Sequence, residues 1–174
     1  MSRIAALLVL VLSCFASPAF AGIGAPDTVV VIVRHAEKAT DDPRDPTLSE
    51  TGQARADALA SALKGLPIAA AYATQYKRTQ LTATPAAHAR GIEVTVRPVD
   101  KANETTYATD LAHDIRRAPP GRNVLIVGHS NTVPEMVKAL TGIDAAPMGD
   151  DEFDRIYVVT LPVDGPARFV VLKY

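Results

Sequence analysis

The chain alternates between short apolar runs and longer stretches in which apolar residues recur every three or four positions. The continuous runs TVVVIV and NVLIV are typical of strands that are buried on both faces of a sheet. A last pair of apolar runs flanks Asp164-Gly165, which predicts a hairpin. In all, the pattern predicts six strands, at residues 28–33, 69–73, 94–99, 123–127, 156–161 and 168–172.

Helical spacing occupies the segments between most of these strands. In three segments apolar residues fall at positions i, i+3, i+4 and i+7, which places them on one face of a helix. A fourth segment contains Pro85, which we expect to bend or split its helix. The predicted helices cover residues 56–63, 77–89, 108–115 and 133–140.

This alternation of strands and helices predicts an α/β fold with an open, mostly parallel sheet and helices on both faces. The last two strands are expected to add antiparallel edges. In such sheets ligands bind beyond the carboxyl ends of the strands, so the loops at that edge are the ones to inspect for a site.

The N-terminal segment has the features of a secretory signal peptide. Arg3 precedes an apolar run, and Ala19-Phe20-Ala21 fits a cleavage site after Ala21. We therefore expect a signal peptide at residues 1–21, a single domain at 22–174 and a periplasmic or secreted protein. A minor alternative is lipid anchoring at Cys14, where Leu12 is bulky for a lipoprotein signal.

Composition narrows the function further. The 174 residues carry 18 Lys+Arg and 19 Asp+Glu, a formal net charge of −1, and no Trp. This balance argues against a nucleic-acid partner, which would require a basic surface. No stretch after residue 21 is long and apolar enough to span a membrane. Since Cys14 is the one cysteine, His35-Ala36-Glu37 cannot belong to a zinc deaminase, which needs a Cys-x-x-Cys pair.

Polar clusters directly follow three of the predicted strands. They are RHAEK at residues 34–38, TQYKRT at 74–79 and GHSNT at 128–132. Because the carboxyl ends of parallel strands share one edge of a sheet, we expect the three clusters to meet there.

The third cluster resembles the nucleophile elbow of serine hydrolases, with Ser130 at its centre. Two features count against a serine hydrolase. Thr132 replaces the closing glycine of the elbow, and no histidine follows His129 to complete the usual order of serine, acid and histidine.

The charges of the clusters favour a phosphate site. Arg34 and Arg78 suit bidentate contact with phosphate oxygens, and His35 and His129 can act as nucleophile and as proton-bearing stabiliser. Thr132 and Glu135 have capping-box spacing, so a helix that begins near Thr132 would point its free N–H groups at the same anion.

These clusters are similar to the motifs of the histidine phosphatase superfamily, the phosphoglycerate-mutase-like clan. The similarity includes Leu48-Ser49-x-x-Gly52 and Thr74-x-x-x-Arg78-Thr79-x-x-Thr82-Ala83, and it extends over nearly all of residues 27–161. It implies a phosphoric monoester hydrolase that acts on a small phosphorylated substrate without a cofactor or a metal ion.

The resemblance also implies roles for particular residues. His35 would attack as a neutral imidazole and form a phosphohistidine, with its second ring nitrogen donating to a backbone carbonyl. Arg34 and Arg78 would hold the phosphoryl oxygens, and His129 would donate to the transferring group. Ser130 and Asn131 are further candidates for phosphate binding.

Two positions depart from the family pattern. Ala36 stands where the family usually has glycine, which puts the backbone beside the nucleophile in question. The general acid is also open: Ser130 follows His129 in place of an aspartate, so Glu104 is the preferred candidate, with Asp151 and Glu152 as weaker alternatives.

The small domain favours hydrolysis over phosphoryl transfer back to a retained intermediate. A non-catalytic anion-binding module remains the main alternative, ahead of a Ser130 hydrolase.

Overall fold

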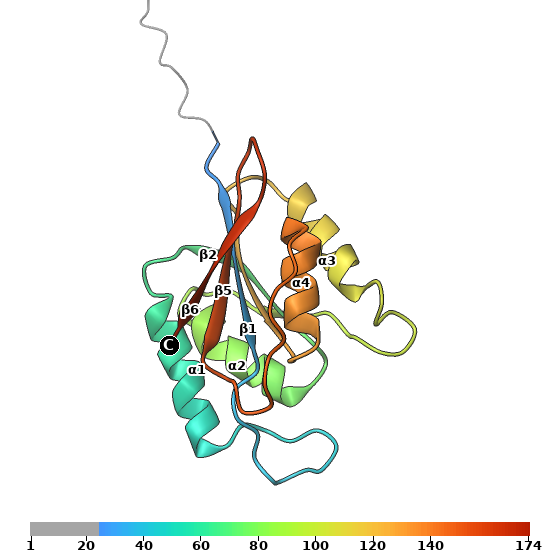
Figure 1. Cartoon of the computed structure of the whole chain (residues 1–174). Coiled ribbons are helices and arrows are strands. Elements are labelled where there is room, and N and C mark those ends of the chain that lie inside the picture. The colour runs from blue at the N-terminus through green and yellow to red at the C-terminus, as the bar shows by residue number, and fades with distance from the viewer. Residues whose placement is uncertain (1–24) are drawn as a thin grey trace, which may run out of the picture.

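The computed structural model describes residues 25–174, so the expected signal peptide and Cys14 lie outside the described residues. A six-stranded sheet runs through the middle of the molecule (Figure 1). Its strands are β1 (Thr28–Arg34), β2 (Ile68–Ala73), β3 (Val94–Val96), β4 (Asn123–Gly128), β5 (Arg155–Leu161) and β6 (Arg168–Lys173).

The strand order in the sheet is β3-β2-β4-β1-β5-β6. The first four strands in this order are parallel, whereas β5 runs antiparallel to β1 and β6 antiparallel to β5. The predicted α/β class with antiparallel strands at one edge is therefore confirmed.

Four helices cover the two faces of the sheet, with α1 and α2 on one face and α3 and α4 on the other (Figure 1). They are α1 (Glu50–Ala62), α2 (Lys77–His88), α3 (Tyr107–Arg117) and α4 (Thr132–Thr141). Leu59 and Ala86 lie in one buried cluster with Leu125 of β4, and Leu111 and Met136 lie in a second cluster with Ile126. None of these four helices has the length and apolar character of a membrane span.

Pro85 does not split α2, which continues to His88, because Ala86 and Ala87 are buried and their packing keeps the last turn helical. One local expectation was wrong. Strand β3 ends at Val96 rather than at Val99. Arg97 still donates its N–H to the carbonyl of Ala73, but Pro98 has no N–H with which to continue the ladder.

Candidate active site

The three polar clusters meet at one edge of the sheet because β2, β4 and β1 are neighbours and run parallel. A cavity of about 490 Å³ opens there. All seven residues with a predicted catalytic or phosphate-binding role line this cavity: Arg34, His35, Arg78, Glu104, His129, Ser130 and Asn131.

His35 follows β1 directly, and its backbone N–H donates to the carbonyl of Gly128. Its Nδ1 lies 2.8 Å from the carbonyl oxygen of Ala36. Since a carbonyl can only accept, Nδ1 carries a proton and Nε2 is the basic nitrogen of the neutral ring. Burial lowers the pKa of His35 to about 4, and the positive charges of Arg78 and Arg34 act in the same direction. The free protein therefore holds His35 neutral at pH 7.

His129 follows β4 and faces His35. The two ring centroids are 5.4 Å apart, with an angle of 67° between the ring planes. Nε2 of His129 lies 2.9 Å from the hydroxyl oxygen of Thr74, at the end of β2. Burial lowers the pKa of His129 to about 3, with further contributions from His35 and the two arginines. The paired imidazoles are thus both neutral and both anchored.

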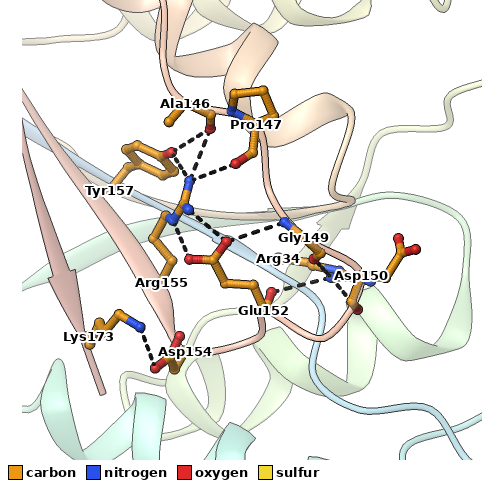
Figure 2. Close-up of polar contacts among 10 residues, drawn as sticks. All are labelled: Arg34, Ala146, Pro147, Gly149, Asp150, Glu152, Asp154, Arg155, Tyr157 and Lys173. Carbon is orange, nitrogen blue, oxygen red and sulfur yellow. Dashed lines mark hydrogen bonds and ion pairs between the residues drawn. The ribbon is translucent and has the colours of Figure 1, made fainter.

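Arg34 is the last residue of β1 and is 7% exposed. Its Nη1 lies 2.7, 2.8 and 3.3 Å from the backbone carbonyls of Gly149, Asp150 and Glu152 (Figure 2). Its guanidinium carbon sits 4.3 Å from the centre of the Phe153 ring. Burial lowers the pKa of Arg34, but a guanidinium keeps its charge in proteins. The carbonyls position this cation without neutralising it.

Arg78 lies in the first turn of α2, with its guanidinium carbon 4.3 Å from the centre of the Tyr76 ring. Burial lowers its pKa too. Within residues 25–174, the Nε atoms of both Arg78 and Arg34 are buried without a hydrogen-bond partner. A buried donor without a partner is unfavourable, so both arginines that line the cavity keep a guanidinium donor that the described residues do not satisfy.

The loop after His35 accommodates Ala36. The methyl group is fully buried, and the N–H of Ala36 donates to the Thr82 hydroxyl over 2.9 Å. The next residue, Glu37, forms a bidentate ion pair with Arg55 of α1. Glu37 therefore orients an arginine that lies outside the cavity.

The candidate acids occupy different places. Glu104 lies in the turn between β3 and α3, is exposed, and lines the cavity. Asp151 and Glu152 do not line it, and the carboxylate of Glu152 is bound by Arg155 at 2.6 and 2.7 Å.

Among residues 25–174, no three His, Cys, Asp or Glu side chains gather in a way that could hold a metal ion.

The expected capping box at α4 does not form. Asn131 is the N-cap residue and Thr132 is already the first residue of the helix. The Thr132 hydroxyl accepts from the N–H of His129 over 2.8 Å, so this side chain positions the histidine loop. Asn131 makes no capping hydrogen bond with its side chain and lines the cavity beside Ser130.

Sequence reasoning missed two sets of supporting residues. The threonines 74, 79 and 82 are buried at the start of α2 and connect it to the two histidine loops. All three stand within the motif that resembles the superfamily, and that position was the signal that could have identified them; their burial is visible only in the fold. The carbonyls that hold Arg34 come from residues 149–152, and backbone carbonyls leave no mark in a sequence.

Comparison with protein families gives one match. The sequence model of the histidine phosphatase superfamily (branch 1) matches residues 30–107, which include Arg34, His35 and Arg78. This match, together with the shared fold, supports the superfamily. A sequence search of the curated proteins finds no significant match.

Solved structures share the fold. The protein histidine phosphatase SixA, complexed with tungstate, superimposes with a TM-score of 0.62 at 22% identity, over 84% of this chain and 97% of that one. A mycobacterial glucosyl-3-phosphoglycerate phosphatase, complexed with VO3, gives a TM-score of 0.60 at 15% identity, over 84% and 98%. Phosphoserine phosphatase from Entamoeba histolytica, with 3-phosphoglyceric acid, gives 0.61 at 14% identity, over 84% and 97%. At these identities the likeness shows the fold.

Proposed function

We propose that this protein hydrolyses phosphate monoesters through a phosphohistidine formed at His35. The observation that carries the proposal is the state of His35: a neutral imidazole whose Nδ1 is held by a carbonyl, in a cavity that two arginines also line. The match to the superfamily model supports phosphatase chemistry, and the SixA and mycobacterial phosphatases of the same fold are complexed with oxyanions that resemble phosphate.

In the first step Nε2 of His35 attacks the phosphorus atom, and the bond between phosphorus and the ester oxygen breaks. Arg34 and Arg78 stabilise the charge on the phosphoryl oxygens. Glu104, in its protonated form, gives a proton to the leaving alkoxide. The negative charge of the bound phosphate raises the proton affinity of His129, so this ring becomes a donor to the phosphoryl group only when the substrate is present.

In the second step water attacks the phosphorus of the phosphohistidine, and the phosphorus–nitrogen bond breaks. The carboxylate of Glu104 accepts the proton of the water, which restores the acid for the next cycle. Inorganic phosphate leaves and His35 returns to its neutral form. A domain of this size has little material with which to exclude water, so hydrolysis outcompetes phosphoryl transfer. Mutase turnover dependent on 2,3-bisphosphoglycerate that exceeded hydrolysis would contradict this step.

The substrate is a small phosphorylated molecule. Beyond the phosphate-binding residues, the cavity is lined by Tyr76 and Val99 together with Lys38, Asp100 and Lys101. These mixed charges suit a polar leaving group. A periplasmic or secreted location, as the N-terminal segment predicts, would favour envelope phosphoesters.

The direct test replaces the nucleophile. H35A should lower hydrolysis of p-nitrophenyl phosphate by at least about 1,000-fold, since covalent catalysis has no substitute in the site. The wild type, quenched during turnover, should carry a phosphoryl group on His35 that is labile in acid and stable in base. H113A is the matched control, because His113 is exposed on α3 and should leave the rate unchanged. Substantial activity in H35A would refute the proposal, and phosphate binding without turnover in the wild type would favour an anion-binding module.

A leaving-group series tests Glu104. E104Q should lose about 100-fold on an alkyl phosphate and little on p-nitrophenyl phosphate, because a good leaving group departs without a proton. Equal losses on both substrates would remove Glu104 as the acid.

Ser130 is not expected to react with serine-directed inhibitors, since within residues 25–174 it has no hydrogen bond to a histidine.

A further inference from the structure

A second layer of contacts lies behind the carbonyls that hold Arg34, and its centre is Arg155, the first residue of β5 (Figure 2). We infer that Arg155 is a positioning residue for phosphate binding: it keeps the carboxylate of Glu152 away from Arg34, so that the Arg34 guanidinium stays available to the phosphate. This inference rests on the proposed function, because it concerns the same phosphate site.

Arg155 uses every nitrogen of its guanidinium. Nε and Nη2 donate to the two carboxylate oxygens of Glu152, at 2.7 and 2.6 Å. Nη1 lies 3.0 and 3.2 Å from the carbonyls of Ala146 and Pro147 and 2.7 Å from the hydroxyl of Tyr157. Because Tyr157 is fully buried in the core, this end of Arg155 is anchored to the body of the domain.

Glu152 stands between the two arginines. Its backbone carbonyl accepts from Nη1 of Arg34, and its side chain pairs with Arg155 and accepts from the N–H of Gly149 (Figure 2). Glu152 thus contacts Arg34 through a neutral backbone carbonyl, while its carboxylate is paired with Arg155. Without Arg155 the partly buried carboxylate would have no ion-pair partner, and Arg34 is close enough for that charge to raise its pKa.

The charge balance around Arg34 supports this role. The carboxylates of Asp150, Asp151 and Glu152 are close enough to raise the pKa of Arg34 against the larger lowering by burial. Asp150 and Asp151 are exposed, so water screens them, whereas the Glu152 side chain is 22% exposed. A carboxylate that moved onto Arg34 would compete with phosphate for the same guanidinium donors.

The test measures binding of inorganic phosphate to the mature chain by calorimetry, which requires no turnover. R155M should weaken phosphate binding by about tenfold, because the freed carboxylate occupies Arg34. The double variant E152Q/R155M should recover most of that affinity, since it has no carboxylate to compete. If Arg155 were only structural, the double variant, which also lacks the ion pair, would bind phosphate no better than R155M.

K173M is the matched control. Lys173 pairs with Asp154 at 3.1 Å beside the network but has no contact with Arg34 or Glu152, so phosphate affinity should stay within about twofold of the wild type (Figure 2). Thermal unfolding establishes that each variant is folded at the assay temperature. R155L, which likewise removes the cation beside Glu152, takes the place of R155M if R155M does not fold.

The inference is overturned if folded R155M binds phosphate as the wild type does, or if the double variant is as weak as R155M. Neither result depends on catalysis. A wild type that binds phosphate but hydrolyses no ester would refute the proposed function. The phosphate affinities of the wild type and the two variants would still test the role of Arg155.

Discussion

Arg34 and Arg78 both line the cavity, but their supports come from different parts of the chain. The contacts that hold Arg34 and its loop come from residues 46 to 118 positions away, at Thr82 and at the carbonyls of residues 149–152. Arg78 lies over Tyr76, two residues earlier, and its carbonyl accepts from the hydroxyl of Thr82, four residues later. The Arg34 side of the cavity is therefore assembled by tertiary contacts and the Arg78 side by its own helix.

This difference indicates which of the two arginines is more easily displaced by substitutions elsewhere in the domain. A helical turn forms its own supports as it folds, so changes elsewhere in the domain leave Arg78 in place. Arg34 depends on a loop that lies far away in sequence and on the contacts behind it. We expect substitutions that affect the Arg34 side to act over longer distances.

The largest expected effect separates the two arginines directly. R34K should lower kcat/KM for p-nitrophenyl phosphate by about 1,000-fold and R78K by about 100-fold. A lysine at position 34 has a single ammonium group, which cannot both satisfy three carbonyls and contact the phosphate. Equal losses in the two variants would show that the long-range support of Arg34 has no catalytic consequence.

The next effect concerns how α1 anchors the loop that carries His35. A Cβ at Gly52 would lie 2.2 Å from the carbonyl oxygen of Glu37, so the backbone would have to move. We expect G52A to lower the free energy of unfolding by about 3 kcal/mol, measured by urea denaturation. G65A is the control, because a Cβ there meets nothing within 4 Å. A similar stability for the two variants would mean that the loop tolerates displacement.

Acid should destabilise the fold through the two histidines. Their folded-state pKa values, about 4 for His35 and about 3 for His129, lie below the unfolded value near 6.5. Between these limits the unfolded chain binds more protons, so stability falls as pH drops from about 6.5 towards 4, by up to about 1.4 kcal/mol per pH unit for each group. Urea denaturation at pH 7, 6 and 5 should show a shallower fall in H129N than in the wild type. Equal slopes would contradict the neutral state of His129.

The smallest expected effect tests a single hydroxyl. T82V removes the acceptor for the buried N–H of Ala36, so stability should fall by about 1.5 kcal/mol and phosphate affinity with it. T84V is the control on the same helix: Thr84 is exposed and its hydroxyl donates to the carbonyl of Gln80. We expect less than about 0.5 kcal/mol there, measured by thermal unfolding. If T82V and T84V lost the same stability, the Thr82 hydroxyl would not be the group that supports Ala36.

Much of the fold was predictable because each element carries its own signal. The runs TVVVIV and NVLIV are apolar at every position and became the two central parallel strands β1 and β4. The stripe of Leu111, Ala112 and Ile115 became the buried face of α3. The end of β3 failed at Pro98, since pairing with the neighbouring strand decides whether a segment continues.

The sequence by itself determined which residues line the cavity. Each candidate except Glu104 directly follows a strand or stands in a motif, and parallel strands bring their carboxyl ends to one edge for a reason that requires no knowledge of side-chain packing. The tertiary structure decided the chemical state of those residues. The neutral histidines depend on burial, the orientation of Arg34 on carbonyls more than a hundred residues away, and the pairing of Glu152 on Arg155. Desolvation and long-range hydrogen bonds arise only when the chain is folded, so no local pattern can encode them.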